Sequence, residues 1–507
     1  MKKNLLWTTS NFDSYHSLGQ FLSIFILFIF LFSCSDDDTQ YDEIDQSGDK
    51  NLISLVFEYD STDYPTSIDN TSVTNSTDFP FFAEEVLIKS FEISENASTN
   101  ISIGQILNIS NDPLSITVTA EDGISKNYSL SLSKDEGLNL SPNMNIEMGS
   151  SYSLQGSDVY VEPNQLTQDF DKFYEAGYAD FNNDGHTDVL LASGVALSFD
   201  YSPILLYLGD GTGVNPDYCE CGGECVQFSC NSFTQKMNAL PSGYEGLQSP
   251  RKILLGDYNS DNLTDVFILG HGYDAPPFPG ESPALLINNG DGFNYEKFNN
   301  VSGFYHGGSS ADFDNDGDID IYLVGSIFLI NDGAGNFTKT SEFIDNEFPP
   351  SAAYYTSEFI DINSDGYIDL LVAGHEHEGA PSYILWGNSS GKYYKDLSST
   401  IPPVSGYNIV IDIDTNDIDG DGDKDLIMYR VNSDIFYLDH YIQVVENDEN
   451  INFNDVTESA IVNSAGIDAY DWIHLQDLNN DGNIDIYLDS NHKPNIKWHG
   501  DGNGGFN

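Results

Sequence analysis

The chain has 507 residues, and 18 lysines and arginines stand against 81 aspartates and glutamates, which gives a formal net charge of −63. Nucleic-acid binding depends on clustered cationic side chains, so this balance excludes nucleic acid as an expected partner. Divalent cations are the natural counter-charge, because much of the acid lies at fixed spacings.

Residues 1–33 are interpreted as a lipoprotein signal peptide. Two lysines precede an uncharged apolar run from Phe21 to Phe32, which is too short to span a bilayer as a helix. The run ends at Cys34, and this ending resembles the lipobox of bacterial lipoproteins, in which the cysteine is lipidated. The resemblance implies a lipid anchor in the cell outer membrane, and the acidic residues 36–38 imply display on its outer face. The alternative is an ordinary signal peptide with a chance cysteine.

Residues 34–50 have the composition of an acidic tether, and residues 51–134 predict a small antiparallel β-sandwich. Its β-rich runs are separated by Asn, Asp, Ser and Gly, and they cover residues 52–59, 85–93, 114–119 and 128–132. The stretch from Thr117 to Gly123, followed by Tyr128, resembles the end of the immunoglobulin-like modules in bacterial surface glycan-utilisation proteins.

Residues 138–507 contain one motif six times, Asp-x-Asn/Asp-x-Asp-Gly-x-x-Asp. A β-rich run follows each copy, and a second apolar strand and a Gly- or Asn-rich turn follow in most units. Repeated units of four short strands predict a β-propeller, here with six blades or, as the alternative, seven. The units resemble the FG-GAP or VCBS repeats of integrin-type propellers. The copies begin at Asp180, Asp257, Asp312, Asp361, Asp417 and Asp477.

The motif places oxygen ligands at alternate positions of a tight loop, which is the arrangement that Ca²⁺ prefers. Position six is Gly in five copies and Asn262 in the second, and both residue types tolerate the positive φ that such a loop needs. An EF-hand is excluded because position twelve is apolar in every copy rather than Glu. Turn formation without metal is the alternative for a single copy, but clustered carboxylates repel one another, and six copies favour a cation. The predicted calcium ligands are Asp180, Asn182, Asp184, His186 and Asp188; Asp257, Asn259, Asp261, Leu263 and Asp265; Asp312, Asp314, Asp316, Asp318 and Asp320; Asp361, Asn363, Asp365, Tyr367 and Asp369; Asp417, Asp419, Asp421, Asp423 and Asp425; and Asp477, Asn479, Asp481, Asn483 and Asp485.

Four cysteines fall within one short insert of the first unit. An even, local set in an exported protein indicates two disulfides, whereas a zinc site would more often show paired Cys-x-x-Cys spacing. The pairing among Cys219, Cys221, Cys225 and Cys230 stays open.

The face of the propeller opposite the Asp loops is expected to gather histidines and aromatic side chains. Three hypotheses compete for it: a module that binds extracellular glycan or a surface protein, a calcium-dependent propeller polysaccharide lyase, and a scaffold without a ligand. Binding or adhesion is preferred, because the chain has no His-Glu-x-x-His or Gly-x-Ser-x-Gly motif. The candidate residues are His271, Tyr273, His306, His375, His377 and Trp472.

The last unit lacks an obvious fourth strand. An unpaired edge is disfavoured in folded proteins, so we expect the β-like run Asp158–Glu162 to pair with this blade and close the ring.

Overall fold

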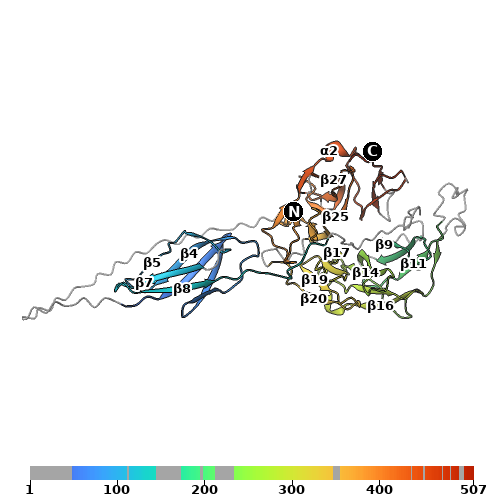
Figure 1. The fold of residues 1–507 in the computed structure, drawn as a ribbon. Coiled ribbons are helices and arrows are strands. Elements are labelled where there is room, and N and C mark those ends of the chain that lie inside the picture. Colours follow the sequence, from blue (N-terminus) through green and yellow to red (C-terminus); the bar gives the residue numbers. More distant parts are fainter. Residues whose placement is uncertain are drawn as a thin grey trace, which may run out of the picture.

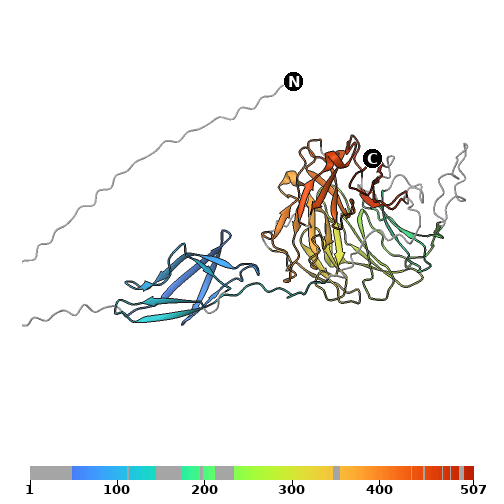
Figure 2. The same cartoon turned by 45° about the horizontal axis from the view of Figure 1, so that its top comes forward.

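The computed structural model describes residues 48–110, 114–143, 173–194, 198–211, 233–345, 354–435, 437–448, 451–470, 472–479, 481–489 and 496–507. It contains one curled N-terminal sheet and six small sheets arranged as propeller blades (Figures 1 and 2). The predicted all-β fold with a six-bladed propeller is therefore confirmed. No helix of the described residues is long and apolar enough to cross a bilayer. The predictions for Cys34, the four-cysteine insert and the run Asp158–Glu162 lie outside these residues.

The N-terminal domain is a sheet of eight strands in the order β5-β7-β8-β3-β2-β1-β4-β6. Pairing is antiparallel except between β3 and β8, which run parallel, unlike the expected wholly antiparallel module. The sheet curls around a core that includes Phe57, Val73, Val118 and Tyr128. The strands are β1 (Leu52–Tyr59), β2 (Thr62–Asp69), β3 (Ser72–Asn75), β4 (Glu85–Ile93), β5 (Ser98–Thr99), β6 (Ile106–Asn108), β7 (Leu114–Thr119) and β8 (Ser125–Ser131).

Each propeller blade is an antiparallel sheet whose strands follow one another in sequence. The first strands of successive blades contact each other and line the inside of the ring. Blade 1 has β9 (Phe173–Ala179), β10 (Asp188–Gly194), β11 (Ile204–Leu208) and β12 (Thr234–Gln235), and blade 2 has β13 (Pro250–Gly256), β14 (Asp265–Gly270), β15 (Ala284–Asn288) and β16 (Phe293–Lys297). Blade 3 has β17 (Gly308–Ala311), β18 (Asp320–Leu323), β19 (Ile327–Ile330) and β20 (Thr338–Thr340), and blade 4 has β21 (Tyr354–Ile360), β22 (Asp369–Gly374), β23 (Tyr383–Leu385) and β24 (Ser398–Thr400). Blade 5 has β25 (Ile409–Asn416), β26 (Asp425–Asn432), β27 (Leu438–Asp448) and β28 (Asn452–Asp455), with β29 (Ala465–Gly466) added to β27, and the described part of blade 6 has β30 (Trp472–Gln476), β31 (Asp485–Asp489) and β32 (Ile496–Trp498). The short helices are η2 (Asn299–Val301), η3 (Glu376–Glu378) and α2 (Thr457–Ala460).

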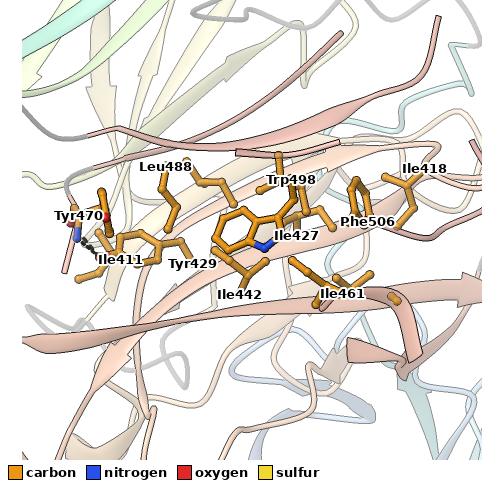
Figure 3. Packing of buried hydrophobic residues seen from close by; sticks show 14 of the residues in the cluster. Ile411, Ile418, Ile427, Tyr429, Ile442, Ile461, Tyr470, Leu488, Trp498 and Phe506 are labelled. Atoms are coloured by element: carbon orange, nitrogen blue, oxygen red, sulfur yellow. Dashed lines mark hydrogen bonds between the residues drawn. The ribbon is translucent and has the colours of Figure 1, made fainter. Parts of the chain in front are cut away.

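The second strand of each blade is buried on both faces because it lies between two neighbouring blades. Every residue of β10, β14, β18 and β22 is buried, which explains their near-continuous apolar sequences. Figure 3 shows the same packing between blades 5 and 6, where Ile427 and Leu488 contribute to one cluster with Trp498. Phe506 joins this cluster and forms a parallel bridge with Ile461.

Buried asparagines at or just after the end of the third strand connect neighbouring blades. The Asn331 side-chain amide of blade 3 donates hydrogen bonds to the carbonyls of Tyr258 in blade 2 (2.9 Å) and Ile319 (3.1 Å). Asn288 makes the equivalent bond to Phe181, and Asn447 makes it to Ile362. Blades 2, 3 and 5 are thereby each fixed to the Asp loop of the preceding blade.

Replacing Asn331 by Ala should destabilise the propeller by about 1–3 kcal/mol, because two buried carbonyls lose their partner. Urea unfolding checks this against Asn289→Ala, which removes an exposed asparagine at the corresponding turn of blade 2. Equal unfolding midpoints for the two variants would contradict the inter-blade role.

The linker between the two domains is held against blades 3 and 4. The Leu138 amide donates to the Ser390 carbonyl (2.7 Å), and Lys392 pairs with Asp135 (2.6 Å). Further along, the Asn143 amide donates to the Gly366 carbonyl (2.8 Å), which belongs to the Asp loop of blade 4. The domain-connecting segment is thus a structural part of the propeller surface.

Gly137→Ala should release this linker, because Gly137 has φ +52° and an added Cβ would collide with the Ser390 carbonyl. We expect faster proteolysis between the domains and a larger radius of gyration in X-ray scattering. Gly123→Ala is the matched control, because it has φ +82° and open space around the added Cβ. Identical behaviour of both variants would refute the linker contact.

Candidate metal loops and ligand face

The six Asp motifs all connect the first and second strands of a blade, so they lie on one face of the ring. The first Asp of each motif organises its loop: Asp180 Oδ1 accepts from the Asp184 amide (3.0 Å) and Oδ2 from the Gly185 amide (2.8 Å). The predicted positive φ at position six is confirmed, with +90° at Gly185 and +65° at Asn262. Position four also has positive φ, for example +58° at Asn315, which the sequence analysis did not predict.

The ninth Asp of each motif has a role that the sequence analysis missed. It is fully buried, and in five copies its two carboxylate oxygens accept from two backbone amides. In blade 4, Asp369 Oδ2 accepts from Ile362 in the loop (3.0 Å) and Oδ1 from Gly387 after the third strand (2.7 Å). The sequence could have indicated this role, because the ninth Asp is the first residue of a strand whose other residues are mostly apolar.

The third loop departs from this pattern. Asp320 accepts the Asn331 amide through Oδ1 (2.8 Å), but its buried Oδ2 has no hydrogen-bond partner. Asp314 Oδ1 is buried and lacks a partner in the same way. Oxygens of Asp312, Asp314 and Asp316 lie within 4.8 Å of one another, and the same holds for Asp417, Asp419 and Asp425. Both clusters could hold a metal ion.

Without a bound cation, burial and mutual repulsion make it unfavourable for all the Asp carboxyls of the loops to be ionised together. Burial raises the pKa of Asp188, Asp265 and Asp425 to about 7. Burial and the neighbouring Asp314 charge raise the pKa of Asp320 to about 9. A bound cation would offset these costs.

On the opposite face, four of the predicted candidates form a continuous series of ring contacts. His271 lies 4.6 Å from His306 between ring centroids, His306 stacks on Tyr355 at 3.6 Å, and Tyr355 stacks on His375 at 4.9 Å. His377 follows at 5.3 Å from His375. These rings stack on one another, so much of their surface is used within the protein.

Trp472 is buried, and its indole N–H donates to the Arg251 carbonyl (3.2 Å). The Arg251 guanidinium lies 5.5 Å from the indole ring. Trp472 is therefore a packing residue where blade 6 meets blade 2.

This face also carries an exposed aromatic patch. Of its residues, only Tyr273 was predicted from the sequence. We define it as Phe199, Tyr201, Tyr273 and Phe278, which lie on the connections between the second and third strands of blades 1 and 2. Phe199 is 62% exposed and stacks on Tyr273 at 4.1 Å, while Tyr201 and Phe278 are 46% and 49% exposed. Among the aromatic side chains in the described ranges, only Phe199, Tyr201 and Phe278 are this exposed.

Comparison with known proteins supports the repeat and little beyond it. Residues 361–428 match the FG-GAP-like repeat family. No curated protein matches the chain. Three solved structures share 12–16% identity. An Agrocybe aegerita lectin that recognises non-reducing terminal N-acetylglucosamine has TM-score 0.36 and 15% identity, covering 68% of this chain and 87% of the lectin.

The other two structures are bacterial. A DUF4623 family protein from Bacteroides eggerthii has TM-score 0.29 and 12% identity, covering 87% of this chain and 95% of that one. A Bacteroides thetaiotaomicron putative glycoside hydrolase has TM-score 0.15 and 16% identity, covering 33% and 54%. The matched family segment begins at the Asp loop of blade 4 and extends through that of blade 5. The chain is a six-bladed β-propeller with an FG-GAP-like repeat.

Proposed function

We propose that the protein is a calcium-binding, cell-surface lipoprotein whose propeller binds an extracellular glycan through the aromatic patch. The observation that carries the glycan assignment is the concentration of exposed aromatic rings on two adjacent loops. Aromatic faces pack against the apolar faces of sugar rings while the surrounding polar groups bind hydroxyls. The lipid anchor at Cys34 and the acidic tether would display this patch outside the cell.

The Asp loops fit calcium by their donor set, which is carboxylate, amide and backbone oxygen. The buried, unpartnered oxygens of Asp314 and Asp320 in the third loop give the structural support. Calcium here would stabilise the blade rather than take part in ligand binding, since the aromatic patch lies on the other face.

The calcium proposal predicts a characteristic dependence of stability on pH. In a chelator, the melting temperature should fall as pH rises from about 5 to 9, because Asp314 and Asp320 have folded pKa values of about 6 and about 9, above the ordinary value of 3.8. The folded state keeps protons that the unfolded chain has released, so each loss of a proton weakens folding. Excess calcium should remove this trend, adding roughly 4 kcal/mol per site at 1,000 times the dissociation constant.

Differential scanning calorimetry at pH 5, 7 and 9, with calcium and with chelator, measures both effects. Asp314→Asn should reduce the gain from calcium at pH 9, while Lys339→Gln on exposed strand β20 should leave it unchanged. A melting temperature at pH 9 that is indifferent to chelator would show that the loops fold without a cation.

For the glycan, Phe199→Ala and Tyr273→Ala should each weaken binding by about tenfold, equivalent to ~1.4 kcal/mol. A glycan array identifies a bound sugar and calorimetry measures its affinity. Ile451→Ala is the control, because Ile451 is 60% exposed on the connection between β27 and β28, on the Asp-loop face. The assignment would be overturned if all three variants lost glycan affinity equally, or if the array retained no glycan. Release of unsaturated uronides from an acidic polysaccharide would favour the lyase hypothesis instead.

A further inference from the structure

A further cluster of side chains that could bind a metal ion lies in the turn between β22 and β23, on the face opposite the Asp loops. Ligand atoms of His375, His377 and Glu378 lie within 4.8 Å of one another. His375 Nδ1 is 3.6 Å from Glu378 Oε2, and His377 Nε2 is 3.9 Å from Glu378 Oε1. Ligands around tetrahedral zinc with bonds of 2.0–2.1 Å are separated by about 3.4 Å, and the two His–Glu separations are close to this spacing.

The second nitrogen of each imidazole is held by the surrounding protein. His375 Nε2 lies 2.8 Å from Tyr437 Oη, and His377 Nδ1 lies 3.4 Å from the Asn408 carbonyl. The carbonyl can only accept, so a bond there places the proton of His377 on Nδ1, and Nε2, which faces Glu378, then carries the lone pair that a metal ion would bind. Metal-binding histidines are typically oriented by such contacts to the distal nitrogen.

The turn that carries these residues is fixed to the core of the propeller through Glu376. Glu376, between the two histidines, pairs with the fully buried Arg430, with Oε2 2.8 Å from Nη1 and Oε1 3.2 Å from Nη2. Glu376 also accepts a hydrogen bond from Ser382 Oγ (2.7 Å). These contacts hold the short helix η3, and with it the backbone that carries His375, His377 and Glu378, in one position.

We propose that His375, His377 and Glu378 bind a divalent transition-metal ion, with zinc as the preferred ion. Two imidazoles with one carboxylate suit zinc and its neighbours, whereas calcium prefers oxygen alone. The Glu378 side chain is 54% exposed, against 12% for His375 and 28% for His377, so solvent reaches the site from the Glu378 side. Three protein ligands would leave a coordination position for water or an exogenous oxygen ligand. This inference does not depend on the glycan or the calcium proposal.

The test titrates the purified, tag-free full chain with Co²⁺ as a spectroscopic substitute for zinc, in excess Ca²⁺ to saturate the Asp loops. We expect a visible d–d absorption spectrum that Zn²⁺ abolishes by competition. His377→Ala and Glu378→Gln should remove the spectrum, while Glu92→Gln, on an exposed position of β4 in the N-terminal domain, should keep it. Tyr437→Phe should retain the spectrum with affinity lowered by about 10–100-fold, because it removes only the contact to His375 Nε2.

Two outcomes would overturn the proposal. One is the absence of Co²⁺ or Zn²⁺ binding by calorimetry when circular dichroism shows a folded chain. The other is metal binding that survives both His375→Ala and His377→Ala, which would place the metal elsewhere. If thiol alkylation then abolished the metal binding, the metal would be located at the cysteines.

Discussion

The propeller depends on a carboxylate that bridges two backbone amides. In each blade the ninth Asp of the motif is buried at the start of the second strand, where a charge without partners would be costly. Its oxygens bind the Asp loop on one side and, on the other, the turn after the third strand. The loop conformation and the spacing of the strands are thereby set by one side chain. This bridge recurs in five blades, while in blade 3 Asp320 accepts only the Asn331 amide.

The remaining connections join whole blades to one another. Buried asparagines link consecutive blades, and a salt-bridge network spans the inside of the ring. Lys252 of blade 2 pairs with Glu358 of blade 4 (2.9 Å) and with Asp412 of blade 5 (3.5 Å). These carboxylates make the lysine strongly basic despite its burial, raising its pKa above the ordinary value. Because its partners come from non-adjacent blades, this network favours one closed arrangement of the ring.

Much of the ring could be predicted from the sequence, because the Asp motif repeats and is followed by apolar strands. The positive φ at Asn262 could also be predicted, because asparagine tolerates the left-handed region better than most residues. Strand β2 escaped prediction, since its sequence around Pro65 is mostly polar and reads as a loop. The contribution of Phe199 to the aromatic patch depends on two loops from different blades meeting in space, and no local pattern encodes that contact.

The two faces of the disc are under different physical constraints. Five of the Asp loops are bound to their own blade by the bridging carboxylate, and several are bound to the next blade by an asparagine. The second connections of blades 2 and 4 contain the histidine turns, and each is held by a carboxylate of its own, Glu281 in blade 2 and Glu376 in blade 4. The turn at η3, anchored to the core through Glu376 and Arg430, can present its histidines and Glu378 on a rigid base.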